Sequence, residues 1–443
     1  MAKTRKRHPL PEPRVSWAGI FLLAALMLGG GTRTALTSDF LLMMLGLPMV
    51  WRFIMTFPRG LTWQAAVLIL AIPLLFIWQL MPLPGEQGWV FPHTLDPGKT
   101  LNAFMITLLV TAFFHDLLIS DEKVRESLIY WLFAGVALNL LLSIIQFASP
   151  SFVTTFQPFS WSMNAGFFAN ANHLAALFAL ATPFIVVIFH RSAYSFLSIP
   201  VILMLIAFQF LVGSRAGIIM TTVIAIAAYL LVASRGLWGY MVLALGGAIA
   251  GFLAWRFFPD IISSFGLQGN YNRKIFALNT LAAIRDFWPW GSGLDTFTLV
   301  YPKYESATGI YRAYVNHAHN DWLELVLEGG IIAIALTGLY IVLLGWSVVR
   351  AERLNSMQKA ALLGILFLMV HSLVDYPLRT LALSLLFAWL NALIFAKPEK
   401  RKKGRMRVRH KAGDDFRHSP APLAGRRPPP GMSGSLSFPP HET

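Results

Sequence analysis

The chain has 443 residues, of which 56% are hydrophobic and only 13% are charged, whereas an ordinary soluble domain carries about 25% charged residues. This composition and the repeated apolar runs exclude a soluble domain with one large core and predict a protein that crosses a membrane many times. Cysteine is absent, which excludes disulfides and thiol chemistry.

The formal net charge of +15 is concentrated at the two ends of the chain. Residues 1–14 hold five basic residues and one acidic residue, and residues 397–443 hold twelve basic and four acidic residues. Basic ends on an apolar body predict cytoplasmic tails beside anionic lipid and no nucleic-acid partner. For the C-terminal tail, a merely solubilising role is an equal alternative. Its Pro/Gly/Ser-rich part predicts disorder.

Twelve segments approach the roughly 20 apolar residues that a spanning helix needs. They are 17–31, 38–57, 61–81, 100–118, 128–149, 172–189, 194–213, 216–233, 237–257, 321–348, 358–375 and 379–396. The first has the basic and apolar parts of a signal peptide, but no good small-x-small cleavage site follows, so we interpret it as an anchor. The second is the least regular, because Arg52 lies inside it.

Lysine and arginine in the short loops predict the orientation. With the N-terminus inside, the cytoplasmic loops hold most of these residues, and an even number of spans returns the basic tail to the cytoplasm. The expected organisation is a basic cytoplasmic N-terminus (1–16), a transmembrane domain (17–396) and a disordered cytoplasmic tail (397–443). The fold class is therefore an all-α, polytopic membrane bundle.

One external connection, residues 258–320, is far longer than the usual loop of a compact domain, and such loops are usually functional. The sequence predicts a helix at 272–287 within it. Its last part reads NHAHNDWLELVLEGG (316–330) and leads into the tenth predicted span. Asp321 and Glu324 have the spacing of a capping box, with Asp321 as the N-cap.

His317, His319 and Asn320 would then lie just before the first turn of that helix. The free N–H groups of a helix N-terminus favour anions and disfavour a protonated imidazole. A neutral histidine beside an anion site can serve as a general base. The alternative interpretation is that these residues only cap a helix that enters the membrane.

Further polar clusters fall at the same predicted side of the membrane. They are Asn172 and His173 in FANANHLAAL, Arg215 in GSRAG, and His371, Asp375 and Arg379 in HSLVDYPLRT. Ionisable groups at membrane depth are costly and indicate function. Taken singly, each has a structural alternative: interfacial anchoring, snorkelling of Arg215 to headgroups, or an Asp375–Arg379 ion pair.

The long loop adds Arg273, Arg285 and Arg312. Guanidinium groups bind phosphate oxygens in a bidentate way, so the sequence predicts a diphosphate pocket with a base beside it. There is no P-loop, no His-Glu-x-x-His and no acidic pair of the kind that holds a divalent metal. We therefore expect neither a metal nor a cofactor.

These motifs resemble the bacterial O-antigen ligase and polymerase superfamily of membrane glycosyltransferases. The resemblance covers roughly 160–380 and rests on HAHNDWLELVLEGG, FANANHLAAL, GSRAG and RDFWPWGSGLDTF in this order. About twelve spans, with a large, partly helical periplasmic loop between the ninth and tenth, also match this GT-C-type family. The resemblance implies the inner membrane, with the site facing the periplasm.

The family implies an undecaprenyl-diphosphate-linked glycan as donor, and lipid A–core or a growing polysaccharide as acceptor. Its essential histidine corresponds to His319 and its diphosphate-binding arginine to Arg215, whereas His317 and the loop arginines have no secure counterpart. The match does not separate ligase, polymerase and protein O-oligosaccharyltransferase. Two rivals of other classes also stay open: a flippase or transporter for lipid-linked glycans, and a non-catalytic assembly subunit.

Overall fold

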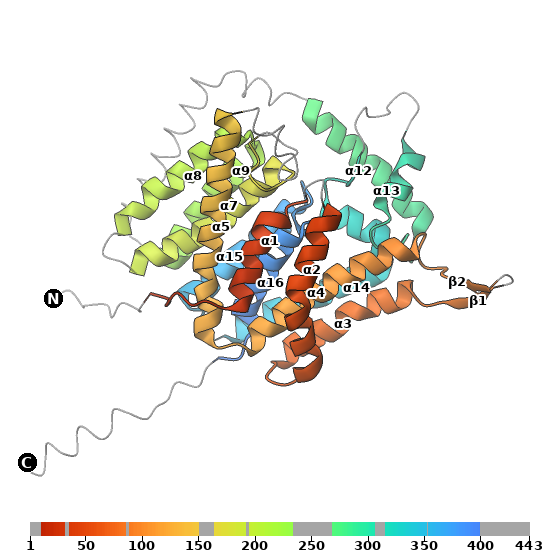
Figure 1. The fold of residues 1–443 in the computed structure, drawn as a ribbon. Coiled ribbons are helices and arrows are strands. Elements are labelled where there is room, and N and C mark those ends of the chain that lie inside the picture. Colours follow the sequence, from red (N-terminus) through yellow and green to blue (C-terminus); the bar gives the residue numbers. More distant parts are fainter. Residues whose placement is uncertain are drawn as a thin grey trace, which may run out of the picture. The chain divides into compact units, whose positions relative to one another are not determined.

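The computed structural model describes residues 10–31, 35–85, 88–149, 164–191, 195–233, 268–305, 315–351 and 353–398. The chain divides into two compact units, Met1–Lys397 and Pro398–Thr443. All helices and strands of the described residues belong to the first unit, which is mostly α-helical (Figure 1). The all-α prediction is confirmed for this part of the chain.

The N-terminal helices begin at capping residues that the sequence supplies. Ser16, Thr62 and Asp96 each accept a hydrogen bond from a backbone N–H of the first turn that follows. The helices are α1 (Trp17–Leu28), α2 (Ala35–Thr56), α3 (Trp63–Gln79), α4 (Pro97–Ile119) and α5 (Glu122–Ala148). Between α3 and α4, β1 (Leu83–Gly85) and β2 (Gly88–Val90) form an antiparallel hairpin in which Leu83 is paired with Val90.

The next helices are α7 (Ala171–Arg191), α8 (Ser198–Val212) and α9 (Arg215–Ala228), which continues as the π-helical turn η3 (Tyr229–Ala233); η2 (Ser195–Leu197) precedes α8. α8 ends at Gly213, whose φ of 77° is left-handed and suits glycine. Ser214 then caps α9 by accepting from the Gly217 N–H. This tight reversal holds α7, α8 and α9 together as neighbours.

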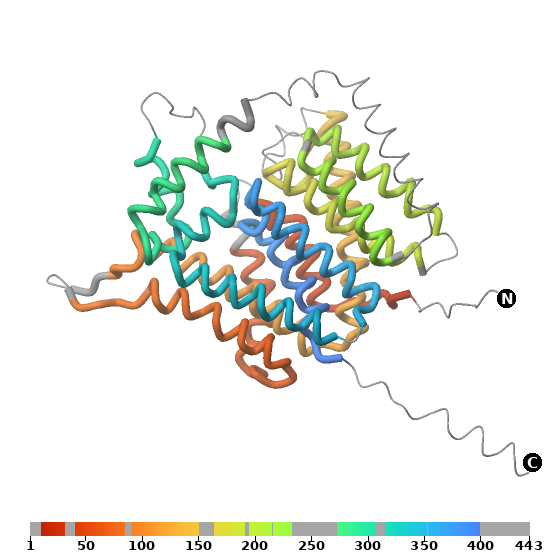
Figure 2. The backbone as a smooth tube through the Cα atoms, turned by 180° about the vertical axis from the view of Figure 1, so that it is seen from behind, coloured from red at the N-terminus to blue at the C-terminus, as the bar shows by residue number. Residues whose placement is uncertain are grey.

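The C-terminal helices include the most buried helix of the bundle, α16. They are α14 (Asp321–Arg350), α15 (Ser356–His371) and α16 (Leu381–Phe395), with the short turn η5 (Pro377–Arg379) before α16. α16 packs against α1, α4 and α15 (Figure 2) and is buried almost all round, with Trp389 fully covered. A helix that is apolar on every side belongs inside a bundle, so α16 is the packing axis around which the others are arranged.

The long connection contains α12 (Gln268–Phe287), α13 (Phe297–Val300) and η4 (Tyr301–Tyr304). The predicted helix at 272–287 is confirmed and begins four residues earlier. Phe276 on α12 packs with Phe297, Tyr301 and Leu327 in a small hydrophobic cluster of its own. Because Leu327 lies on α14, this cluster attaches the connection to the first turns of α14.

Gly330 allows the long connection to contact α14 at a second place. Its φ of 56° interrupts the helical geometry of α14, and an added Cβ would lie only 2.2 Å from the Pro289 carbonyl oxygen. Pro289 O accepts a hydrogen bond from Ile331 N, and Glu328 O accepts one from Gly293 N. The connection therefore binds backbone groups that the kink in α14 releases.

Every predicted span outside 237–257 coincides with a helix, and 237–257 lies outside the described residues. Within the described residues, five helices can cross a membrane by length and composition: Pro97–Ile119, Glu122–Ala148, Ala171–His190, Ser195–Val212 and Asp321–Arg350. Several others are apolar but shorter. The number of about twelve spans and the periplasmic placement of 258–320 stay predictions.

Candidate functional site

The backbone before α14 turns sharply at His319. Its φ of 51° is left-handed, which is uncommon for a residue with a side chain and frequently marks functional sites. Asn320 follows as the N-cap, and its side chain accepts from the Leu323 N–H at 3.0 Å. The prediction of Asp321 as the N-cap is wrong, because the Asp321 carboxylate is used elsewhere: it accepts from Ser372 Oγ and the Leu378 N–H.

His319 is held between aromatic rings and one carboxylate. Its ring stacks on Phe276 from α12, with the ring centres 5.9 Å apart, and meets Tyr376 edge-on at 5.0 Å. His319 Nδ1 lies 3.3 Å from Asp375 Oδ1. The side chain is 25% exposed, so the imidazole is fixed by its neighbours yet open on one side.

Asp375 is the centre at which the predicted motifs meet. Its carboxylate is 1% exposed and accepts a hydrogen bond of 2.7 Å from Asn172 Nδ2. His173 Nε2 lies 3.8 Å and Arg273 Nη2 3.7 Å from its oxygens. Asp375 is therefore an anion that positive or proton-donating groups surround.

The start of α9 is connected to the same centre. Ser214 Oγ donates to Asn172 Oδ1 at 2.8 Å, and Asn172 in turn donates to Asp375. Arg215 is the first residue of α9, so its backbone follows directly on this chain of hydrogen bonds. The Arg215 side chain lies outside the described residues.

A second set of contacts surrounds Arg379. Its Nη1 donates to Glu328 Oε2 at 2.6 Å and lies 3.5 Å from Glu324 Oε1. Its Nε lies 3.6 Å from Asp321 Oδ1. Arg379 therefore pairs with the carboxylates of α14, in the part of the chain described, and not with Asp375. The alternative of an Asp375–Arg379 ion pair is therefore wrong, and these contacts also leave Arg379 little capacity for its predicted role in substrate binding.

Glu324 joins the two sets. It shares a hydrogen bond of 2.8 Å with His317 Nδ1 and accepts another from the Ala318 N–H. Burial lowers the pKa of His317, but the Glu324 carboxylate more than offsets this and the pKa is raised overall. The ring of His317 also packs on Tyr376, whose pKa is raised by burial. By accepting hydrogen bonds from residues 317 and 318, Glu324 fixes the position of the segment that precedes His319.

The remaining predicted residues are Arg285, Arg312 and Asn320, and in the described part of the chain none of them is shown to contact Asp375. Arg285 is exposed and lies twelve residues beyond Arg273 on α12, which is about 18 Å along the helix at 1.5 Å per residue. Arg312 falls outside the described residues. Asn320 lies at the centre, but its side chain serves the backbone: it caps α14 and donates to Leu373 O.

Sequence reasoning missed the roles of Glu324, Glu328 and Tyr376. A signal was present, because Asp321, Glu324 and Glu328 have the spacing i, i+3 and i+7, which places three carboxylates on one face of an otherwise apolar helix. Such a face requires a cation, and Arg379 supplies it. The packing of Tyr376 against His173, His317 and His319 has no comparable signature.

Chemically, the arrangement places one partly exposed imidazole against a buried anion, with a guanidinium nearby. A carboxylate beside Nδ1 favours the tautomer that carries its proton there and leaves the Nε2 lone pair to accept one. Among the described residues, no group of three or more His, Asp or Glu side chains is placed to hold a metal ion.

No family model matches the chain, and no curated protein matches it in sequence. The fold and the site by themselves define a class: a helical bundle with several helices apolar enough to cross a membrane and a histidine–carboxylate cluster at one end.

Proposed function

We propose that this protein is a membrane glycosyltransferase that moves a glycan from an undecaprenyl-diphosphate carrier to an acceptor hydroxyl during surface polysaccharide assembly. It would lie in the bacterial inner membrane with the cluster facing the periplasm. The observation that supports this most is the convergence on Asp375 of His319, Asn172 and, through Ser214, the start of α9. These residues belong to three of the motifs that resemble the O-antigen ligase and polymerase superfamily.

In the proposed reaction, His319 Nε2 takes the proton of the acceptor hydroxyl. The acceptor oxygen forms a bond to the anomeric carbon of the donor, and the bond from that carbon to the diphosphate oxygen breaks. The electron pair leaves with the lipid diphosphate, which needs no general acid. A single displacement of this kind inverts the anomeric centre. Asp375 stabilises the imidazolium that forms, because it lies 3.3 Å from Nδ1.

Arginine side chains would stabilise the charge on the departing diphosphate. Arg273 is suited to this role, because its side chain is 37% exposed and its Nη2 lies 3.7 Å from an Asp375 oxygen. Arg215 is proposed as its partner, from its place in the Ser-Arg turn. The three α14 carboxylates around Arg379 make it a structural cation in this proposal, not a diphosphate ligand.

The same chemistry would serve a protein O-oligosaccharyltransferase, in which the acceptor is a protein hydroxyl. A lipid-linked glycan transporter would use a similar donor without breaking the bond, and a non-catalytic assembly subunit would need neither His319 nor Arg215. Release of free lipid diphosphate separates the two transferases from the transporter and from the assembly subunit, and the identity of the glycosylated acceptor separates the two transferases.

The test uses purified protein in detergent, a lipid-diphosphate glycan and a hydroxyl acceptor, and it measures release of lipid diphosphate and glycosylated acceptor. We expect turnover without added divalent metal. Arg215→Lys keeps the charge but loses the planar guanidinium, so it should impair transfer, and Arg215→Ala should impair it further. Transfer that depends on a nucleotide-sugar donor or on added Mg²⁺ or Mn²⁺ would overturn the proposal.

A further inference from the structure

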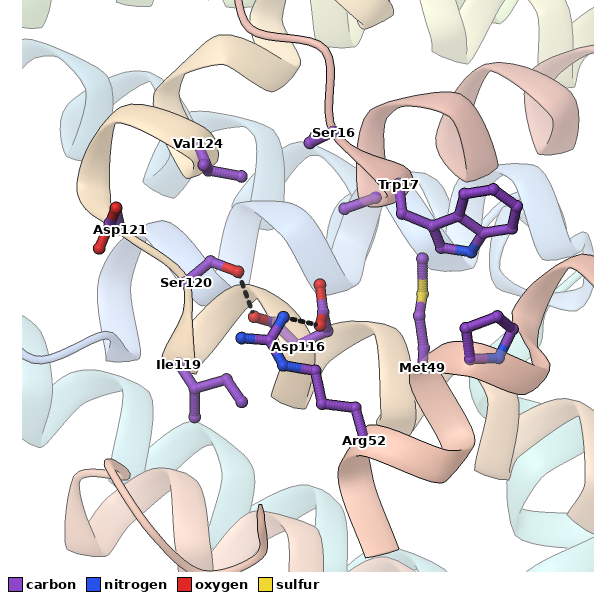
Figure 3. Close-up of a pocket in the computed structure, with 11 residues that line it drawn as sticks. Ser16, Trp17, Met49, Arg52, Asp116, Ile119, Ser120, Asp121 and Val124 are labelled. Carbon is purple, nitrogen blue, oxygen red and sulfur yellow. Dashed lines mark hydrogen bonds and ion pairs between the residues drawn. The ribbon is translucent and has the colours of Figure 1, made fainter. Parts of the chain in front are cut away.

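A polar cavity lies beside the start of α1, and none of its lining residues belongs to the histidine–carboxylate cluster (Figure 3). Helix α1 extends from the cavity to the end of the bundle at which α16 begins. The carbonyl of Gly29, after the last turn of α1, accepts from Ala382 N in the first turn of α16. Ser16 and Trp17, at the start of α1, line the cavity. The twelve residues of α1 separate these ends by about 18 Å.

The cavity has a volume of about 390 Å³. It is formed by the start of α1, the second half of α2, and the turn between α4 and α5. Trp17, Met49 and Ile119 give it apolar walls, and Arg52 extends across it in Figure 3. The cavity is therefore amphipathic: apolar side chains form part of its wall, and charged side chains, including Arg52, form the rest.

Arg52 and Asp116 are the charged groups at its centre. Arg52 Nη1 donates to Asp116 Oδ1 at 2.5 Å, and the two side chains are 46% and 10% exposed. In the described part of the chain, no hydrogen bond uses Arg52 Nε or Nη2. Arg52 therefore has N–H groups left to donate to an anion.

Asp121 is a second acidic residue that lines the same cavity. It occupies the N-cap position of α5, but its side chain makes no capping hydrogen bond, although aspartate commonly makes one there. The cavity thus holds one cation with free donors and two carboxylates, and only one of these is paired with Arg52. A ligand that carries only negative charge would meet an excess of carboxylate.

Exposed apolar side chains continue from the cavity along α2. Leu47, Trp51 and Met55 are 51%, 63% and 52% exposed, which suits contact with acyl chains. Trp17, at the edge of the cavity, is 45% exposed, and tryptophan is enriched where membrane hydrocarbon meets headgroups. A molecule with a charged head and apolar chains would satisfy both surfaces.

We propose that this cavity binds the headgroup of a zwitterionic aminophospholipid, with the phosphate on Arg52 and the ammonium group between Asp116 and Asp121. The charges match in sign, and an ammonium group can donate hydrogen bonds to both carboxylates. A trimethylammonium headgroup has no N–H to donate, and a glycerol headgroup brings no positive charge. The proposal assumes that the protein lies in a membrane, but it is independent of glycan transfer.

The test measures binding of three lipids with identical acyl chains to delipidated protein, by native mass spectrometry from detergent. The lipids are phosphatidylethanolamine, phosphatidylcholine and phosphatidylglycerol. The ammonium group of phosphatidylethanolamine donates charge-assisted hydrogen bonds that the other two headgroups lack, so we expect this lipid to bind at least about tenfold more strongly than either of them. Equal binding of the three lipids by the unsubstituted protein would overturn the proposal.

Two substitutions locate the site. Arg52→Gln removes the phosphate partner, and Asp121→Asn removes one ammonium partner while keeping a good N-cap residue. Both should lower phosphatidylethanolamine binding, and Asp121→Asn should also reduce the preference over phosphatidylcholine, because the two lipids share the phosphate and differ only at the amine. Arg14→Gln is the control, because Arg14 lies at the same end and pairs with Glu12 outside the cavity. Unchanged binding by Arg52→Gln, or equally strong competition by soluble phosphoethanolamine, would contradict a lipid headgroup site.

Discussion

Removal of the Arg379 guanidinium should destabilise the protein strongly, because it leaves buried carboxylates without their cation. Glu328 and Glu324 are 0% and 1% exposed, and the closest contact is 2.6 Å. At that distance an ion pair has a gross Coulomb energy of about 6 kcal/mol with an effective dielectric constant near 20. Desolvation offsets part of this, and the loss of one partner from a buried pair costs about 3–5 kcal/mol. We expect a loss of this size for Arg379→Met.

The assay is unfolding in mixed micelles, followed by circular dichroism. The double variant Arg379→Met with Glu328→Gln removes the cation and its closest carboxylate, so it should be more stable than the sum of the two single effects by at least about 1 kcal/mol. Arg14→Met is the control, since Arg14 pairs with Glu12 at the surface, and its effect should stay within about 0.5 kcal/mol. An Arg379→Met effect as small as that of the control would refute the buried ion network.

Three further predictions concern the site and its orientation. Asp375→Asn should reduce transfer without reducing protein level, by part of the roughly 10²–10⁴-fold that a general base supplies; unchanged turnover would show that Asp375 does not support His319. Because the folded-state pKa of His317 is raised, its stabilisation is complete below the ordinary histidine pKa and is lost as the pH rises through the folded value. The unfolding midpoint should therefore fall above about pH 6.5, and His317→Gln should flatten that change; an equal fall in both proteins would assign it elsewhere. Reporter fusions at residues 300 and 405 should report opposite compartments, and a shared compartment would invalidate the predicted topology.

The helices were largely predictable because a membrane span is a long local signal. Runs of apolar residues marked α4, α5, α7 and α14, and the Gly-Ser turn at 213–214 marked the reversal between α8 and α9. The kink in α14 was not predicted, although the paired glycines lie in the motif. It depends on contact between Gly330 and the segment at Pro289, which no local pattern reveals.

The sequence indicated which polar residues belong to the site better than it indicated which of them contact one another. The sequence singled out Asn172, His319 and Asp375, but the hydrogen bond from Asn172 to Asp375 joins residues 203 positions apart. An Asp375–Arg379 ion pair was one alternative for these two residues, whereas the structure pairs Arg379 with carboxylates of α14. Tertiary packing decides which charge meets which, and a single sequence carries little information about that choice.

His317 and His319 each lie beside a carboxylate, so either could in principle be the general base. His317 is hydrogen-bonded to Glu324, whereas His319 is 25% exposed and faces Asp375. Only His319 has the spacing of the histidine in the family that the motifs resemble. The proposal therefore gives catalysis to His319 and positioning to His317.

The most direct test compares single-turnover transfer by His319→Ala and His317→Ala, with lipid diphosphate release as the readout and protein level as the control. The account predicts a loss of roughly 10²–10⁴-fold for His319→Ala and a smaller loss for His317→Ala. Turnover by His319→Ala at the rate of the unsubstituted protein would contradict its role as the base.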